Sequence, residues 1–300
     1  MADAGAAGQL RRFLVEHHPV RGHQVDLGGA WQALRAVHAY PAAVETLLGE
    51  ALAAVVLLAA TLKFRGRLTL QFTGHGAVSL LVAQCTHDFR LRAVAQHETQ
   101  VPPLADFATL VGDGRLAVTV ESGEGGRYQG IVPLAAGGIG ASLETYFASS
   151  EQLPTVLRLY ALGGRAAGLL LQRLPTPADG EAAAARAGEV WEGLCARLQG
   201  LPADLLLQPA ELLLPKIGGE LDCRLFSGTP VTFHCGCGEG RVAQMLRSLG
   251  EAELRDIVRE QGAVTVHCEF CRRAYRFDAI DVEGLIGGQD PGAGGAARPN

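Results

Sequence analysis

The sequence predicts an α+β protein: an N-terminal domain built on a mainly antiparallel sheet with helices, then a helical linker, then a small C-terminal four-cysteine zinc domain. Two patterns carry this prediction. Short alternating strands separated by glycine turns lie between residues 67 and 134, and four cysteines lie within 37 positions near the C-terminus. Tight turns between successive strands indicate antiparallel pairing rather than a series of βαβ units. A chain of 300 residues is long enough for about two domains.

The N-terminal α+β domain, residues 1–177, is expected to contain one long apolar helix and several short strands. The helix covers residues 41–62, where Pro41 suits the first helical position, apolar side chains form a wide face and Gly66 is placed to end it. Further elements follow from the spacing of apolar residues. Extended segments are expected at 67–72, 77–84, 89–93, 116–120, 128–134, 155–162 and 166–174, and helices at 103–111 and 140–150.

Residues 178–230 form the helical linker, which is rich in alanine and leucine and is broken by proline and glycine. The pattern predicts short helices that are too small to form a core of their own. Two triple-leucine runs, at 205–207 and 212–214, would bind other apolar surfaces if they were exposed to solvent. The linker is therefore expected to lie against another part of the protein.

Four clustered cysteines carry the clearest chemical signal. Cys235 and Cys237 are separated by one residue, Cys268 and Cys271 by two, and thirty residues lie between the pairs. Two close thiolate pairs, each on a tight turn, are the arrangement of a tetrahedral four-thiolate zinc site. The sequence therefore predicts a zinc-binding domain over residues 231–287.

The residues around the cysteines predict how the pairs are presented. Gly236 and Gly238 are expected to allow the cramped first turn. Residues 263–267 and 274–277 resemble the two arms of a hairpin around the second pair, and apolar spacing indicates two short helices between the pairs. The Gly/Ala/Pro-rich tail, residues 288–300, is expected to be disordered.

Three other interpretations of the cysteines stay open at this point. The zinc could be permanently structural, in a ribbon that recruits a protein or nucleic-acid partner. Cys268 and Cys271 could serve a thiol oxidoreductase, although the βαβ setting of such enzymes is absent from the pattern. His234 or His267 could replace a cysteine, although four thiolates already complete a tetrahedron.

Nothing else in the sequence indicates catalysis. Cys85, Cys195 and Cys223 lie singly in apolar or helical surroundings and are expected to be packing residues. No phosphate-binding loop, nucleophile elbow or metal-spaced histidine pair occurs. The sequence therefore predicts a protein without catalytic residues, which is not an enzyme.

Charge and hydropathy argue against two classes of partner. The net charge is −5, whereas dedicated nucleic-acid binders carry a basic surplus. The longest uncharged apolar stretch, residues 51–62, is shorter than the roughly 18 residues that a membrane span needs, and the N-terminus has no secretory signal pattern. We expect a cytoplasmic protein that binds neither nucleic acid nor membrane.

With these residues in view, the chain resembles the 33-kilodalton heat-shock protein family over residues 10–286. The combination of a Ser-Glu-Gln-x-Pro motif with Cys-x-Cys and Cys-x-x-Cys, in this order, is specific. The matching stretches are Val20-Arg21-Gly22, Tyr146-Phe147, Ser150-Glu151-Gln152-Leu153-Pro154-Thr155, Ala167 to Gln172 with Leu174-Pro175, Phe233-x-Cys235-x-Cys237, Leu246-x-x-Leu249-Gly250 with Glu253-Leu254, Cys268-x-Phe270-Cys271, and Tyr275-x-Phe277.

The resemblance implies a redox-regulated, ATP-independent holdase chaperone of the bacterial cytoplasm that takes part in the stress response. In this family zinc holds the four thiolates of the reduced, inactive form. The resemblance implies that oxidation forms two disulfides, Cys235–Cys237 and Cys268–Cys271, and ejects the zinc. The zinc domain and the linker would then unfold, the chain would form a homodimer, and exposed apolar surface would bind unfolded client polypeptides.

Overall fold

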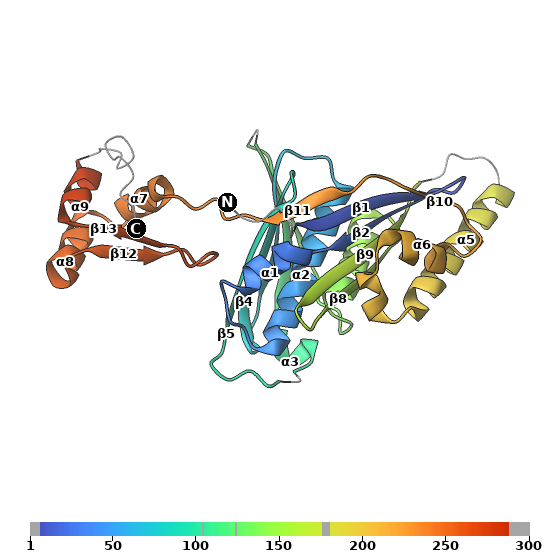
Figure 1. The fold of residues 1–300 in the computed structure, drawn as a ribbon, viewed down its shortest axis with the longest axis horizontal. Helices are drawn as coiled ribbons and strands as arrows, with labels where there is room; N and C mark the ends of the chain where they lie inside the picture. Colours follow the sequence, from blue (N-terminus) through green and yellow to red (C-terminus); the bar gives the residue numbers. More distant parts are fainter. Residues whose placement is uncertain (1–6, 104, 124, 176–180, 288–300) are drawn as a thin grey trace. The chain divides into compact units, whose positions relative to one another are not determined.

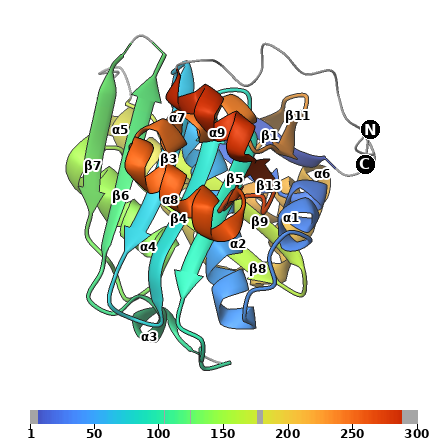
Figure 2. The ribbon, with the colours of Figure 1, turned by 90° about the vertical axis from the view of Figure 1, so that its left-hand side faces the viewer.

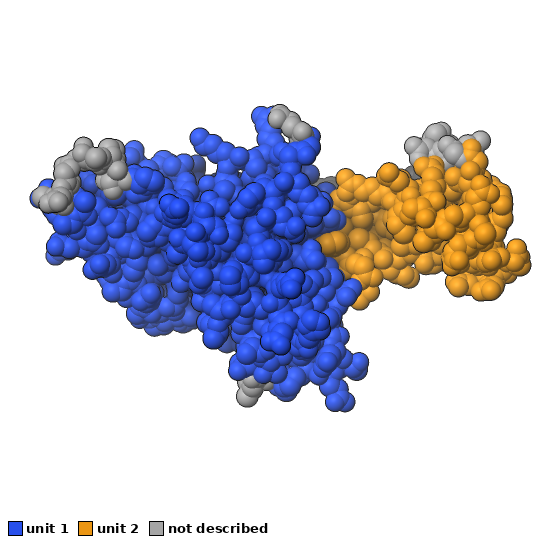
Figure 3. Space-filling model, turned by 180° about the vertical axis from the view of Figure 1, so that it is seen from behind, with its two compact units in different colours: residues 1–234 blue, residues 235–300 orange. Residues whose placement is uncertain are grey.

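The computed structural model describes residues 7–103, 105–123, 125–175 and 181–287. The chain divides into two units, Met1–His234 and Cys235–Asn300 (Figure 3). The finer division into a first domain ending at residue 177 and a linker of residues 178–230 stays a prediction. The tail that the sequence predicts to be disordered, residues 288–300, lies outside the described residues.

The predicted long helix is present as α2 (Ala42–Thr61), and the first unit is organised around it. Pro41 is the N-cap residue rather than the first helical position, so the helix begins one residue later than predicted, and it ends at Thr61 because Leu62 is extended. The prediction that Gly66 ends the helix is wrong. Gly66 begins the next strand with φ of 154°, where a side chain would collide with the Glu121 backbone.

By length and composition alone α2 could cross a membrane, but 78% of its apolar window is buried inside the protein. A helix that is apolar on all sides is one that is buried on all sides. This burial explains why α2 has almost no polar face.

The described part of the first unit contains an eleven-stranded sheet with the order β7-β6-β3-β4-β5-β11-β1-β2-β9-β8, and β10 also pairs with β1. Neighbouring strands are antiparallel except β11 and β5, which are parallel. The strands are β1 (Gly8–Val15), β2 (Val20–Asp26), β3 (Gly66–Thr73), β4 (Val78–Thr86), β5 (Arg90–His97), β6 (Arg115–Ser122), β7 (Arg127–Val132), β8 (Thr155–Leu162), β9 (Arg165–Arg173), β10 (Cys223–Leu225) and β11 (Thr229–Phe233). The predicted α+β class with a mainly antiparallel sheet is confirmed.

Helices cover both faces of this sheet. In Figure 2, strands β7, β6, β3, β4 and β5 lie side by side with α2 behind them, and α2 also contacts β8 and β9 at the other end of the sheet. The other helical segments of the unit are α1 (Gly28–Arg35), α3 (Phe107–Val111), α4 (Ile139–Tyr146), the π-helical η1 (Phe147–Glu151), α5 (Glu181–Gly200), the 3₁₀ segment η2 (Ala203–Leu207) and α6 (Ala210–Gly218).

Two apolar cores lie on opposite faces of β1, β2 and β9. Alternate residues of β9, such as Ala166 and Leu170, join the α2 core, whereas Ala167, Leu169 and Leu171 join a second core. Because successive side chains of a strand point to opposite faces, β9 is buried on both sides. Figure 1 shows α5 and α6 beside β8 and β9, on the side opposite α2.

The second core is where the linker residues pack. Leu206, Leu213, Leu214 and Ile217 are buried in it against the sheet. The sequence predicts only short helices here, but α5 runs for 20 residues and the chain then adds β10 and β11 to the sheet. These strands are too short to show a clear alternation of apolar residues, so the sequence does not predict them, and they form only by pairing with β1 and β5.

The described part of the second unit, residues 235–287, contains three helices and a hairpin. It contains α7 (Glu239–Arg247), α8 (Glu251–Gln261), β12 (Val264–His267), β13 (Ala274–Phe277) and α9 (Ala279–Ile286). The predicted hairpin and the two helices between the cysteine pairs are confirmed. The buried core has nine members: Val242, Ala243, Leu246, Leu254, Val264, Tyr275, Phe277, Val282 and Leu285.

Candidate metal centre

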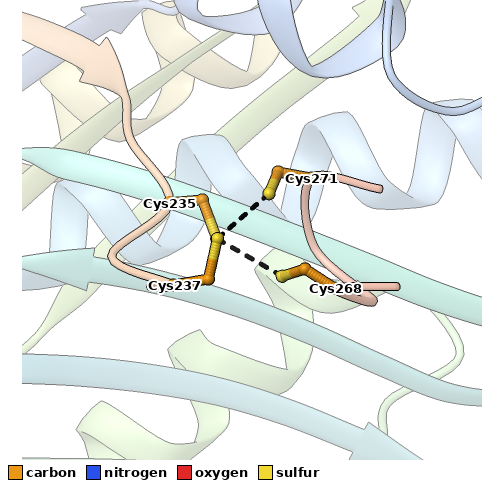
Figure 4. A group of neighbouring side chains, drawn as sticks. All are labelled: Cys235, Cys237, Cys268 and Cys271. Atoms are coloured by element: carbon orange, nitrogen blue, oxygen red, sulfur yellow. Dashed lines mark hydrogen bonds between the residues drawn. The ribbon is translucent and has the colours of Figure 1, made fainter. Parts of the chain in front are cut away.

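Two turns of the second unit present the four clustered cysteines (Figure 4). The first turn, Cys235 to Cys237, leads into α7, whose N-cap is Gly238. The second turn joins β12 to β13 and carries Cys268 and Cys271.

Backbone hydrogen bonds shape the second turn. The Cys268 amide donates to the Arg273 carbonyl at 2.9 Å, and the Arg272 amide donates to the Cys268 carbonyl at 2.8 Å. Arg272 adopts φ of 55°, a left-handed conformation. The turn therefore curls so that the sulfur atoms of Cys268 and Cys271 face the first pair (Figure 4).

The first turn uses its glycines differently from the prediction. Neither Gly236 nor Gly238 has a left-handed φ, and Gly238 is extended at −167°. The Gly236 carbonyl accepts a hydrogen bond from Arg241 Nη1 at 2.5 Å. A side chain at Gly236 would crowd that guanidinium, so this glycine gives the arginine of α7 access to the turn.

The geometry of the four sulfur atoms fits a tetrahedral metal ion. All four Sγ atoms lie within 4.8 Å of one another. The Cys235–Cys268 and Cys237–Cys271 sulfur distances are 3.6 and 3.3 Å. Sulfur atoms placed about 2.3 Å from a central zinc ion at tetrahedral angles would be about 3.8 Å apart. The donor set and its size therefore suit zinc.

The protonation of these thiols also fits a cation site. Burial disfavours the Cys237 thiolate, but hydrogen bonds from Tyr275 and the other cysteines outweigh burial and lower the Cys237 pKa to about 7. Burial raises the pKa of the Cys271 thiol to about 12, and its contacts with the other cysteines add to the rise. Clustered like charges repel each other. A divalent cation removes this repulsion and favours the thiolate form of all four ligands.

The two histidines and three single cysteines that were considered as chemical groups from the sequence lie outside this cluster. Among the described residues, the group that can hold a metal contains four cysteines and neither His234 nor His267. Burial raises the pKa of Cys85 to about 12 and that of Cys195 to about 11. Burial also raises the pKa of Cys223. These three thiols lie outside the group that can hold a metal, so no cation offsets the burial that disfavours the thiolate, which is the form that oxidants attack.

Sequence reasoning missed one polar contact of the centre. The Tyr275 hydroxyl donates a hydrogen bond to Cys237 Sγ at 3.0 Å, and this is the Tyr of the Tyr275-x-Phe277 stretch. Alternation along β13 could have placed Tyr275 and Phe277 on one face. No spacing rule, however, connects Tyr275 with a cysteine 38 positions earlier.

Comparisons with known proteins agree over nearly the whole chain. Residues 8–278 match the family model described as Hsp33 protein. The 33 kDa chaperonin of Nitrosococcus oceani is 42% identical over 278 residues, which cover 92% of this chain and 93% of the relative. The 33 kDa chaperonin of Azotobacter vinelandii is 42% identical over 291 residues, which cover 96% of this chain and 97% of the relative.

A solved structure of a 33 kDa chaperonin also matches the fold of this chain. The crystal structure of the 33 kDa chaperonin, an Hsp33 homolog, of Thermotoga maritima superposes with a TM-score of 0.82 at 25% identity. The match covers 93% of this chain and 98% of the other. On the full-length sequence match and on this fold, the chain belongs to the Hsp33 family.

Proposed function

We propose that this protein is a redox-regulated, ATP-independent chaperone that holds unfolding proteins in solution. Membership of a family whose relatives are named chaperonins supports the chaperone role. The observation that carries the regulation is the cluster of four thiols within 4.8 Å of one another. Such a cluster can bind a metal when reduced and form disulfides when oxidised.

In the reduced form, Cys235, Cys237, Cys268 and Cys271 would hold one Zn²⁺ ion. When bound, the ion links the two turns and supplies much of the stability of the second unit. Structural zinc is worth on the order of 10–16 kcal/mol in small domains at neutral pH. The second unit has an apolar core of only nine described residues, and a module of this size depends on such a link.

The reduced form would be inactive because the linker covers its own apolar surface. Leu206 and Leu213 are fully buried against the sheet. The Gln24 side chain donates to the carbonyls of Leu206 and Gln208 at 3.0 and 2.7 Å, so polar contacts also hold the linker down. Apolar surface covered in this way is unavailable to a client.

Oxidation would release the metal by forming two disulfides, each in a two-electron step that consumes one molecule of hydrogen peroxide. A thiolate attacks hydrogen peroxide, takes one oxygen to become a sulfenic acid and releases hydroxide; a second thiolate then displaces hydroxide and forms the S–S bond. We assign the disulfides to Cys235–Cys237 and Cys268–Cys271. Once oxidation of the first thiolate loosens the link between the two turns, cysteines one or two residues apart still meet often, whereas cysteines more than thirty residues apart do not.

Loss of the zinc link would unfold the second unit and then free the linker. The exposed leucines would bind unfolded clients and a second copy of the chain, which gives the active homodimer. Binding by apolar surface needs no nucleotide and no catalytic residue. We place this activity in the bacterial cytoplasm, with neither nucleic acid nor membrane as a partner.

One experiment tests the proposal directly. Zinc release and suppression of aggregation of a heat-unfolded client protein are followed together while the reduced protein is treated with hydrogen peroxide at a raised temperature, and again after dithiol reduction. We expect both signals to rise together and to reverse together when zinc is supplied. Full suppression of aggregation with zinc still bound would refute the redox switch and favour a permanently structural zinc ribbon.

A further inference from the structure

A cavity of about 340 Å³ lies in the first unit beside the C-terminal end of α2. Its walls come from α2, the segment between α2 and β3, strands β6 and β7, and the helical segments α4 and η1. Most of the lining side chains are apolar, among them Leu58, Phe64, Val118 and Phe147. A largely apolar cavity of this size with a few polar groups is typical of a small-molecule site.

The cavity is rich in aromatic rings. Tyr146 and Phe147 are adjacent residues whose rings meet edge to face, with centroids 5.9 Å apart. Tyr128 lies beside them, because the hydroxyl oxygens of Tyr128 and Tyr146 are 2.9 Å apart. The faces of aromatic rings carry partial negative charge and attract cations within about 6 Å. These rings therefore favour a positively charged ligand over an anion.

Glu151 adds a carboxylate to the same cavity. It accepts a hydrogen bond from Tyr146 Oη at 3.2 Å, and no lysine or arginine in the described part of the chain forms an ion pair with it. Burial, together with the Tyr128 hydroxyl and the Glu151 carboxylate, raises the pKa of Tyr146, so the phenol keeps the proton that it donates. The negative charge of Glu151 is therefore stabilised by a neutral donor and not offset by a cation.

The hydroxyl protons of the lining side chains are already used within the protein. Because Tyr146 donates to Glu151, Tyr128 is the donor in its contact with Tyr146. Thr61 Oγ1 donates to the Leu58 carbonyl at 2.8 Å. These side chains thus offer a ligand ring faces and oxygen lone pairs, which suit a cation, rather than the O–H donors that an anion needs.

Lys63 is the lining residue whose charge opposes a cation. Its side chain is exposed and forms no ion pair with Glu151. A lysine ammonium group stands on a flexible four-carbon stem, so it can stay in solvent when the cavity is filled. Removing the charge of Lys63 and removing that of Glu151 should therefore have opposite effects on a charged ligand.

We propose that this cavity binds an organic ammonium ion, whose apolar substituents pack against Leu58 and Val118 and whose charge lies against the tyrosine rings and Glu151. The site belongs to the first unit, outside the cysteine cluster, and its occupation does not depend on the proposed redox regulation. Two features that a purely apolar cavity lacks set the class of ligand. They are the corner of aromatic rings and the carboxylate without a paired cation.

Two ligands of the same shape test the charge. Choline carries a quaternary ammonium group, and its neutral analogue has carbon in place of the nitrogen. In isothermal titration calorimetry at low ionic strength, with the full-length, reduced, zinc-loaded protein, we expect choline to bind about tenfold more tightly than the analogue. The methyl chemical shifts of Leu58 and Val118 should move as choline saturates the protein. Equal affinity for the two ligands, absence of choline binding, or shifts confined to other parts of the chain would overturn the proposal.

Two exposed charges at the cavity test the sign of the ligand. Glu151→Gln should weaken choline binding about threefold and Lys63→Gln should strengthen it by a similar factor, as expected for charges partly screened by solvent. Glu98→Gln is the control, because this exposed glutamate does not line the cavity, and it should leave the affinity unchanged. The opposite order of the Glu151 and Lys63 variants would assign an anion site, and an equal loss in the Glu98 variant would assign the effect to overall charge; either result refutes an ammonium site.

Variants of Tyr128 separate the ring from its hydroxyl. The side chain is 52% exposed, so replacing it leaves the buried core in place. Tyr128→Phe keeps the ring and should bind choline like the wild-type protein, whereas Tyr128→Leu removes the ring and should bind about threefold more weakly. Equal affinities of these two variants would show that the ring does not attract the ligand, and the proposal would then be wrong.

Discussion

Cys237 and Cys271 have sulfur atoms 3.3 Å apart, but their surroundings shift their pKa values in opposite directions, to about 7 and about 12. Burial acts against the thiolate at both positions. Only Cys237 receives the Tyr275 hydroxyl. At the scale of single residues, the centre therefore places a thiol whose ionisation hydrogen bonds favour, Cys237, beside one whose ionisation burial opposes, Cys271.

Removing one cysteine pair should abolish metal binding. In a Cys268→Ser/Cys271→Ser variant, we expect elemental analysis to find no zinc, whereas the wild-type protein carries about one ion per chain, because the serine hydroxyl stays protonated and is a poor zinc ligand. The control is Cys195→Ser/Cys223→Ser, which changes two half-buried thiols outside the cluster and should keep the zinc. Full zinc content in the first variant would exclude these cysteines as ligands.

His23 gives the first unit a pH dependence with a definite sign. Its side chain is 3% exposed, and Nδ1 has no hydrogen-bond partner among the described residues. Burial, helped by the charges of Arg21 and Arg12, lowers the His23 pKa from 6.5 to about 4. Between these two pH values the unfolded chain takes up a proton that the folded chain does not. Stability is therefore lost as the pH falls through this window, by about 3 kcal/mol at most.

His23→Gln should make this loss smaller. We expect the urea midpoint of the first unit to fall less between pH 7 and pH 4.5 in His23→Gln than in the wild-type protein. His75→Gln, at an exposed histidine, should follow the wild-type curve. Parallel pH curves for His23→Gln and the wild-type protein would contradict the buried neutral state of His23.

At the scale of elements, the packing of α6 buries one of two adjacent leucines and leaves the other exposed. Leu213 is fully buried in the second core, and Leu212 is 59% exposed. In the sequence, the three leucines of the run at 212–214 are equivalent. Only the packing of α6 on the sheet distinguishes them, and this difference supplies a matched pair of variants.

Leu213→Ser should loosen the linker, and Leu212→Ser should not. Removing a buried leucine side chain costs about 2–5 kcal/mol, whereas an exposed change costs about 0.5 kcal/mol or less. We therefore expect Leu213→Ser, like Leu206→Ser, to suppress client aggregation in part without oxidant. Equal activity of the Leu212 and Leu213 variants would argue against the linker as the gate.

At the scale of the whole molecule, the linker and the second unit should respond to oxidation differently from the sheet around α2. We expect amide hydrogen exchange to rise sharply over residues 178–287 after peroxide treatment, because ordering a chain costs about 1–2 kcal/mol per residue and the metal link no longer offsets it. Strands β3 to β7, which lie within residues 66–134 and pack around α2, should stay protected. Client protection with unchanged exchange in the linker would place client binding on the N-terminal domain, residues 1–177.

The elements that depend only on neighbouring residues can be predicted from the amino-acid sequence. The apolar run of α2, the alternation of β3 and β6, the hairpin β12–β13 and the four cysteines can all be predicted, because a helix face, a strand face or a ligand pair lies within a few neighbouring residues. Their existence therefore needs no knowledge of the rest of the chain.

Contacts between residues that are far apart in the sequence could not be predicted and follow only from the packed fold. Gln24 meets the Leu206 carbonyl 182 positions later, β11 joins β5 and β1 at the middle of the sheet, and Tyr275 reaches Cys237 across 38 positions. The physical reason is that these contacts gain their energy only when separate elements are already packed. No local sequence pattern predicts a short strand such as β10 or the burial of a single glutamine.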